Sequence, residues 1–189
     1  MTIEIFWQLI EKARSIAGAN DNAFASALQT ELISLSEEDL LLFQFIYEWY
    51  EIIIIKQPSH LMWSALVLIN RGYCTDTYGF AGYLITHGRE AYEKTLADAD
   101  FLATLNPKKD KCNYKEVRRL AQHIYMERTK TKIRAFEKIY ISVWSKELQD
   151  EITQSLTINP ERRNRDWTQD ELKELFPQLA QVLCKQSKR

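Results

Sequence analysis

The sequence predicts an all-α fold, a single-domain irregular bundle of about seven or eight helices spanning residues 1–189. Apolar residues recur at three- and four-residue spacing, several segments open with a helix-capping residue, and no segment alternates apolar and polar residues convincingly as a strand would. Because 46% of the 189 residues are hydrophobic, the chain can bury a core without a metal or a disulfide framework.

Helical patterns are clear from the start of the chain. Apolar residues at helical spacing predict a helix over residues 3–17, with Thr2 as its candidate N-cap and Gly18 as its stop. A second helix is expected after residues 20–22, where three apolar residues form one stripe: Phe24, Leu28 and Leu32. Both segments should therefore pack one apolar face against a core.

A long helix and a shorter, more apolar one should follow. Residues 36–39 resemble a capping box that opens a helix to about Lys56, and Pro58 ends this helix because proline has no backbone N–H. Residues 61–69 are apolar on nearly every side, so we expect a central helix covered by its neighbours, with Gly72 as its stop.

The helical pattern continues through the middle of the chain. Helices are predicted over residues 77–86 and 89–97, on either side of Gly88. Strong helix formers dominate again over residues 114–145, which favours helical structure there.

One loop and one further helix complete the predicted fold. Residues 156–166 have the composition of a loop and form a candidate flexible basic loop within the domain. Residues 168–171 have the spacing of a capping box, which opens a last helix whose apolar edge runs across Pro177.

Cysteine content and hydropathy bear on the compartment. Three widely spaced cysteines without a Cys-x-x-Cys pair favour a reducing compartment, so we expect a cytoplasmic protein. The first residues lack the basic and apolar segments of a signal peptide. The apolar run 40–55 is too short for a membrane span, and no membrane association is expected because three polar residues interrupt it: Gln44, Glu48 and Glu51.

Short motifs along the chain match one known family. They are Phe-Trp-x-Leu-Ile at residues 6–10, a Leu-Ser-x-Glu-Glu-like segment at 35–39, Leu-Ile-Asn-x-Gly-x-Cys-Thr-Asp at 68–76 and Phe-Pro-x-Leu at 176–179. In these motifs the chain resembles DUF4240, a bacterial family of proteins of unknown function. Tyr73 stands where the family usually has glycine, and Thr77 where it usually has a second aspartate. The resemblance implies a bacterial, soluble, mostly helical protein and supplies no activity.

Several polar residue types gather in and around the 68–76 motif. They form a candidate polar pocket of Trp63, Asn70, Cys74, Asp76, Arg89 and Glu90. The alternative is structural: Asp76 caps the next helix, Asn70 finishes the previous one, and Arg89 pairs with Asp76. A thiolate nucleophile at Cys74 would need a neighbouring histidine, and the sequence places none within its reach. No histidine pair has metal-ligand spacing, so we expect no metal site and no cofactor.

The net charge of −1 hides a division of charge between the two halves of the chain. Residues 1–105 carry 6 Lys or Arg against 14 Asp or Glu, whereas residues 106–189 carry 19 against 12. A basic helix over residues 114–134, together with the 156–166 loop, gives a candidate nucleic-acid face of Lys115, Arg118, Arg119, Lys130, Arg162, Arg163 and Arg165. The alternative is a solvated helix face balanced by the acidic first half.

No complete set of catalytic residues occurs at a recognised spacing. The leading hypothesis is therefore a non-enzymatic protein-interaction or regulatory module, whose protein partner is attracted by the opposed charges. The first alternative is nucleic-acid binding through the basic helix 114–134. The second is an enzyme with a polar site around residues 70–76 and Arg89.

Overall fold

The structure is a computed structural model that describes residues 1–56, 61–72, 76–159 and 167–187. Within these ranges the chain forms helices and no strand, which confirms the predicted fold class. The described ranges contain more helices than the seven or eight expected. In chain order these helices are α1 (Ile3–Ala17), α2 (Asp21–Ile33), α3 (Glu37–Ile55), α4 (Leu61–Asn70), α5 (Thr77–Thr86), α6 (Arg89–Ala97), the 3-10 helix η1 (Ala99–Leu105), α7 (Leu120–Thr129), α8 (Ile133–Ser142), α9 (Lys146–Gln154), α10 (Gln169–Leu175) and α11 (Pro177–Gln186).

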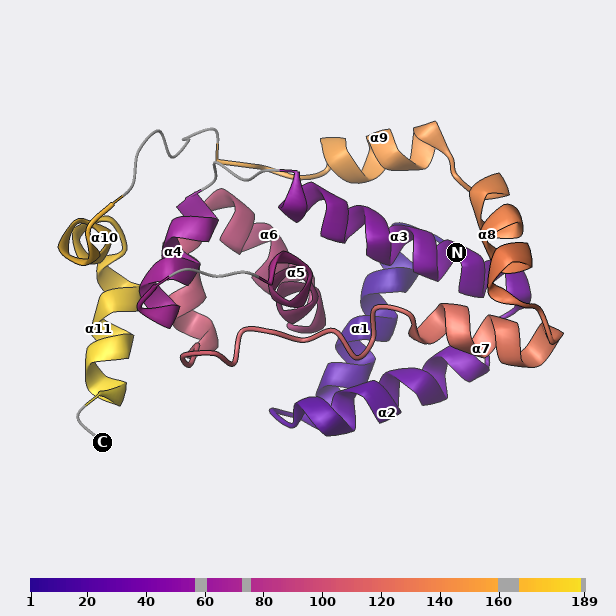
Figure 1. Ribbon diagram of the computed structural model, residues 1–189, viewed down its shortest axis with the longest axis horizontal. Coiled ribbons are helices and arrows are strands. Elements are labelled where there is room, and N and C mark those ends of the chain that lie inside the picture. The colour runs from indigo at the N-terminus through magenta and orange to yellow at the C-terminus, as the bar shows by residue number, and fades with distance from the viewer. Residues whose placement is uncertain (57–60, 73–75, 160–166, 188–189) are drawn as a thin grey trace.

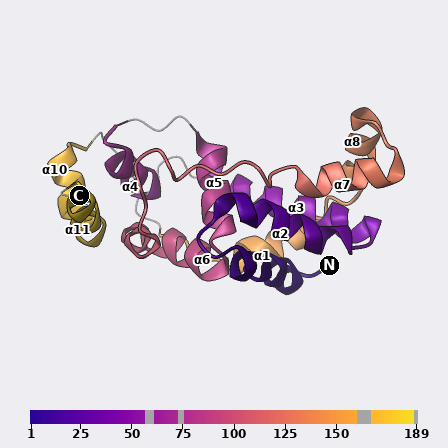
Figure 2. The same ribbon diagram turned by 90° about the horizontal axis from the view of Figure 1, so that it is seen from below.

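The helices are arranged along one long axis of the molecule (Figure 1). Helices α7 and α8 lie toward one end, and α4, α10 and α11 lie together at the other, with α5 and α6 between them. Figure 2 shows the same separation of α8 from α10 and α11 in the perpendicular view. The last helices of the chain therefore pack near α4 and η1 and lie far from α8.

Aromatic side chains from α1, α3 and α6 form the centre of the core. Trp7, Tyr50 and Tyr92 are buried, and the ring of Tyr50 lies 4.8 Å from that of Trp7 and 5.0 Å from that of Tyr92. Trp7 Nε1 donates to Tyr50 Oη at 3.0 Å, and Tyr92 Oη donates to the Tyr50 carbonyl at 2.8 Å. These polar tips are bonded inside the core, so burial does not leave them without partners.

The polar residues that interrupt the apolar run of α3 form a buried polar seam toward α7 and α8. Gln44 Nε2 donates to Glu48 Oε1 at 2.9 Å and to the Arg118 carbonyl at 2.8 Å, and Tyr140 Oη donates to Glu48 Oε2 at 2.7 Å. In the described ranges no helix has the length and apolarity that crossing a membrane requires. The run 40–55 is thus a buried helix of the bundle, as its polar residues predicted.

Three predicted helix starts are confirmed by their caps. Thr2 Oγ1 accepts from the Ile5 N–H at 3.2 Å, and Ser36 Oγ accepts from the Asp39 N–H at 3.1 Å. Thr168 and Glu171 form a reciprocal capping box at the start of α10. Each cap satisfies a backbone donor that the first turn of a helix leaves without an intrahelical partner.

The predicted basic helix over residues 114–134 is wrong, because the described residues there form a shorter helix, α7, and the start of α8. Residues 114 and 115 have no regular secondary structure, residues 116–119 form a turn, and Lys130 ends α7 with a left-handed φ of 56°. Tertiary bonds explain the first break, because the Tyr114 N–H donates to the Gly79 carbonyl at 2.8 Å and the Arg118 carbonyl is bonded to α3. Bonds to α3 and α5 thus override the local helix propensity.

The predicted last helix is in fact two helices. Phe176, with φ −124° and ψ 70°, separates α10 from α11, and Pro177 is the first residue of α11. Proline fits this position because the first N–H groups of a helix have no intrahelical partner to lose.

Candidate functional site

Asp76, the centre of the predicted polar pocket, caps helix α5. Its Oδ1 accepts from the Gly79 N–H at 2.9 Å, while Oδ2 accepts from Asn113 Nδ2 at 2.8 Å and lies 2.5 Å from Lys115 Nζ. Burial raises the pKa of Asp76, but the bonds from Lys115, Gly79 and Asn113 outweigh it and leave the pKa lowered. The carboxylate is thus held ionised by its role at the helix terminus.

The other members of the predicted pocket have different partners. Asn70 Oδ1 accepts from the Asp110 N–H at 3.1 Å, and the ring of Trp63 packs 5.5 Å from that of Phe80. Cys74 lies outside the described residues. Asn70 therefore ends α4 and ties it to the loop after η1.

Arg89 and Glu90 make ion pairs that do not include Asp76. Arg89 Nε donates to Glu93 Oε1 at 2.7 Å, and its Nη1 donates to Glu4 Oε2 at 3.0 Å. Glu90 accepts from Lys94 at 2.6 Å on the exposed side of α6. The structure thus brings Asp76 and Lys115 together, while it engages Arg89 and Glu90 in pairs of their own.

The predicted nucleic-acid face is divided among several elements. Lys115 pairs with Asp76, and Arg118 donates to Glu51 Oε2 at 2.9 Å while its guanidinium lies 3.9 Å from the centre of the Tyr78 ring. Arg119 and Lys130 are exposed, whereas Arg162, Arg163 and Arg165 lie outside the described residues. Two of the four described cations of this face are therefore already paired with carboxylates of the protein.

A cavity of about 700 Å³ lies between the end of α1, the end of α5 and the segment that follows η1. Its volume falls within the range of roughly 300–1,000 Å³ that is typical of small-molecule sites. We call it the basic cavity, and it is lined by Arg14, Gly18, Ala19, Tyr83, His87, Thr104, Leu105, Asn106, Lys108 and Lys111.

Arg14 is fixed at the edge of the basic cavity by contacts to three other segments. Its Nε donates to the Thr86 carbonyl at 2.8 Å and its Nη1 to the Gly18 carbonyl at 3.2 Å, and the guanidinium lies 4.4 Å from the centre of the Phe24 ring. Gly18 ends α1 with a φ of 58°, which favours glycine. The turn after α1 and the end of α5 therefore hold this cation in place.

His87 contributes an imidazole from the end of α5. Its Nδ1 lies 2.7 Å from the Tyr83 carbonyl, and because a carbonyl oxygen only accepts, Nδ1 must carry the hydrogen. The two rings pack together with their centroids 4.2 Å apart. The imidazole is thus oriented by the same helix turn that supplies Tyr83 to the wall of the cavity.

The segment after η1 supplies the two lysines. Asn106 ends η1 in a left-handed conformation with a φ of 49°, and the buried Pro107 follows it. The Lys111 N–H donates to the Lys108 carbonyl at 3.1 Å, and the buried Cys112 closes the segment. Because both ends of this turn are buried, two of its three exposed lysines, Lys108 and Lys111, are held at the cavity, while Lys109 does not line it.

The electrostatics of the basic cavity favour an anion. Arg14, Lys108 and Lys111 are basic side chains, and no Asp or Glu of the described residues lines the cavity. Cations gathered in a concave site reinforce each other's field and attract anionic ligands, even in a chain whose net charge is −1. This arrangement can bind an anion with several charged oxygens, as a phosphate group has.

Sequence reasoning did not find this site. Arg14, His87 and Lys108 come from segments far apart in the chain, and no motif spacing connects them. The only local signal is the Lys-Lys-Asp-Lys run at residues 108–111, which by itself is typical of a solvated loop.

Comparison with known proteins places most of the chain in a family. The model of a family described as "Protein of unknown function (DUF4240)" matches residues 1–143 of the chain. Every residue that lines the basic cavity falls inside the matched region. No curated protein and no solved structure matches the chain.

Proposed function

Since the chain belongs to DUF4240, a family of proteins of unknown function, we propose a role from its own geometry. It acts as a non-enzymatic regulatory module that binds a small phosphate-bearing anion in the basic cavity. The observation that carries the proposal is the convergence of Arg14, Lys108 and Lys111 on one cavity with no carboxylate among its described lining residues. A cavity of about 700 Å³ suits a small molecule better than a polymer.

The arrangement of the cations supports a ligand with more than one charged group. Arg14 comes from α1, whereas the two lysines come from the turn after η1, so they approach the cavity from different elements. Arginine suits the planar, bidentate recognition of phosphate oxygens, while lysine acts as a mobile point charge. A ligand held by all three would link α1 to the η1 segment and would stabilise the fold through mass action.

Titration calorimetry with inorganic pyrophosphate tests this proposal. Lys108→Gln and Lys111→Gln should each weaken binding about tenfold, because a hydrogen bond to a charged group contributes roughly 1.5–3 kcal/mol. Lys109→Gln is the matched control, since Lys109 is an exposed lysine of the same turn that does not line the cavity. Equal weakening by all three substitutions would show that affinity depends only on the net charge of the protein, and it would reject the cavity as the site.

A protein partner is a second candidate function, supported by exposed apolar side chains on and just after α8. Among the described residues, Ile141 is 66% exposed and Trp144 44% exposed, and Arg134 and Lys138 are exposed on the same helix. Apolar surface of this kind can serve as an interaction site. Glu137 is exposed on α8 as well, so its two exposed cations outnumber its one exposed carboxylate and favour a partner segment that is acidic as well as apolar.

The comparison of two matched substitutions tests this second candidate. Ile141→Asp should release a partner captured by the wild-type protein, whereas Ile16→Asp should not, because Ile16 is similarly exposed at 64% but lies on α1. Nuclease treatment in parallel separates protein capture from nucleic-acid capture. A partner lost equally from both variants, or only after nuclease treatment, would contradict an α8 docking surface.

A further inference from the structure

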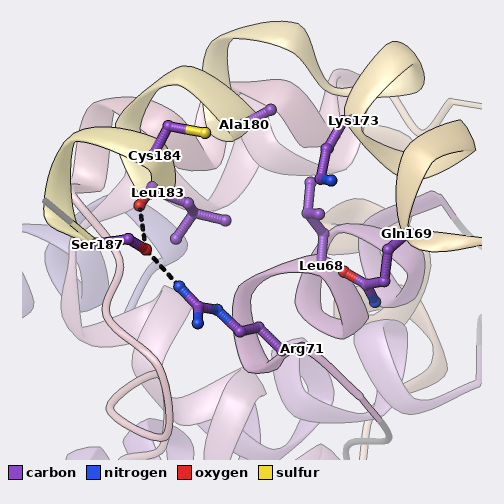
Figure 3. A pocket seen from close by; sticks show the side chains of 8 residues that line it. All are labelled: Leu68, Arg71, Gln169, Lys173, Ala180, Leu183, Cys184 and Ser187. Carbon is purple, nitrogen blue, oxygen red and sulfur yellow. Dashed lines mark hydrogen bonds between the residues drawn. The ribbon is translucent and has the colours of Figure 1, made fainter.

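A second cavity, of about 450 Å³, lies between the end of α4 and the helices α10 and α11 (Figure 3). It shares no lining residue with the basic cavity, so it raises a separate question about ligands. Its volume also falls within the range of roughly 300–1,000 Å³ that is typical of small-molecule sites. We call it the C-terminal cavity.

The C-terminal cavity combines an apolar wall with cations. Leu68 is buried on α4, and Ala180 and Leu183 face it from α11 as partly buried residues. Arg71 and Lys173 extend toward the cavity from different elements, as Figure 3 shows. No Asp or Glu appears among its described lining residues. An amphipathic molecule with one negative charge matches this surface better than a fully polar or a fully apolar one.

The walls of the C-terminal cavity are fixed by bonds to η1. The buried Asp100 accepts from the Gln178 N–H at 3.0 Å and from the Leu179 N–H at 2.8 Å, at the start of α11. At the other end of α11, Gln186 Nε2 donates to Asn106 Oδ1 at 2.9 Å. Because both ends of α11 are anchored, the cavity is formed before any ligand arrives, which lowers the entropy lost on binding.

Among the described residues, the partners of these two cations are exposed, so a ligand can replace them. Arg71 Nη2 donates to the Ser187 hydroxyl, and that hydroxyl donates to the Leu183 carbonyl at 3.1 Å. Lys173 pairs with the exposed Asp170 at 2.8 Å. Exposed ion pairs contribute little to stability, so exchanging such a partner for a ligand carboxylate requires little free energy.

We propose that the C-terminal cavity binds an amphipathic carboxylate. The carboxylate accepts hydrogen bonds from the Arg71 guanidinium, and the hydrocarbon body lies along Leu68, Ala180 and Leu183. Arginine is suited to this role because its planar fork of donors matches the two oxygens of a carboxylate. The cavity is thus a ligand site independent of anion binding in the basic cavity.

Titration calorimetry of the full chain with octanoate tests the proposal, with octanol as the uncharged control. Octanoate should bind more tightly than octanol, and Arg71→Gln should weaken octanoate about tenfold or more while leaving octanol unchanged. Lys185→Gln is the matched control because Lys185 is an exposed cation of α11 that does not line the cavity. Equal affinities for octanoate and octanol, or an Arg71→Gln variant with unchanged octanoate affinity, would overturn the proposal.

A second variant and a chemical modification experiment test octanoate binding without relying on Arg71→Gln alone. Leu183→Glu places a like charge on the apolar wall at a partly buried position and should abolish octanoate binding, with folding checked by circular dichroism. In the wild-type protein, octanoate should protect the exposed Cys184, which lines the cavity, from alkylation by iodoacetamide, as read by peptide mass mapping. Unchanged alkylation of Cys184 at millimolar octanoate would also overturn the proposal. Pyrophosphate binding would be the same whether or not octanoate binds, so the two proposals can fail separately.

Discussion

Arg118 Nε, in the turn before α7, donates to Glu51 Oε2 near the end of α3 at 2.9 Å. The Glu51 side chain is buried, and its second oxygen accepts no hydrogen bond from any described residue. Burial raises the pKa of Glu51 to about 7, although the bond and the charge of Arg118 oppose this shift. One ion pair thus joins the acidic half of the chain to the basic half at a site that titrates near neutral pH.

The stability of the protein should depend on Glu51 between pH 4.5 and about 7. The folded state keeps the Glu51 proton to higher pH than the unfolded state, so the contribution of this group to the free energy of unfolding falls as pH rises through this window. The full change is on the order of 3 kcal/mol. Urea unfolding from pH 5 to 8 should therefore show Glu51→Gln gaining stability relative to the wild type as pH rises.

The exposed Glu127 on α7 offers a control for this measurement. Glu127→Gln should follow the pH dependence of the wild type. A constant difference in stability between Glu51→Gln and the wild type from pH 5 to 8 would show that Glu51 does not titrate near neutrality in the folded protein.

Gly82→Ala should destabilise the fold by about 3 kcal/mol, because a Cβ at this position would lie 2.0 Å from the Tyr114 carbonyl oxygen. This close approach lets the turns before α7 pack on α5. Gly72→Ala is the control, since a Cβ there would meet no atom of the described residues within 4 Å. Thermal or urea unfolding of the two variants measures the difference in their stability. Comparable stability of both would place residues 114–119 further from α5.

Asp100→Asn should cost roughly 1–3 kcal/mol in the free energy of unfolding. Both oxygens of the buried Asp100 accept from backbone N–H groups at the start of α11, and an amide would turn a donor toward one of them. Asp110→Asn makes the same change from carboxylate to amide at an exposed position and should have little effect on the free energy of unfolding. If chemical unfolding finds equal stability for the two variants, α11 does not depend on Asp100 for its anchorage.

The sequence signals that succeeded were local ones. Thr2, Ser36 and Thr168 act through backbone groups three residues away, so spacing alone identifies them as caps. The interpretation of Asp76 as the cap of the next helix depended on the same local spacing, and Asp76 does accept from the Gly79 N–H. The polar residues of α3 likewise indicated a buried bundle helix.

The features that sequence reasoning missed depend on contacts between distant segments. The helix expected over 114–134 is interrupted at its start because the Gly79 carbonyl and the Gln44 side chain bond to backbone groups before α7. Helix propensity contains no information about these bonds. The same limit applies to the basic cavity, since Arg14 and Lys108 line one cavity only after α1 has packed on α5 and η1 on α6. The structural alternative for the polar pocket also paired Arg89 with Asp76, and this part was wrong because the fold brings Glu4 and Glu93 to Arg89.

The most direct test of the central claim is to locate bound pyrophosphate from the amide chemical-shift changes that it causes in the labelled protein. Binding in the basic cavity predicts changes concentrated in residues 14–19, 83–87 and 104–111, which saturate with added ligand and vanish in a Lys108→Gln, Lys111→Gln double variant. Changes concentrated instead on α8 or on residues 169–187, or no saturating change at millimolar pyrophosphate, would contradict anion binding at this site.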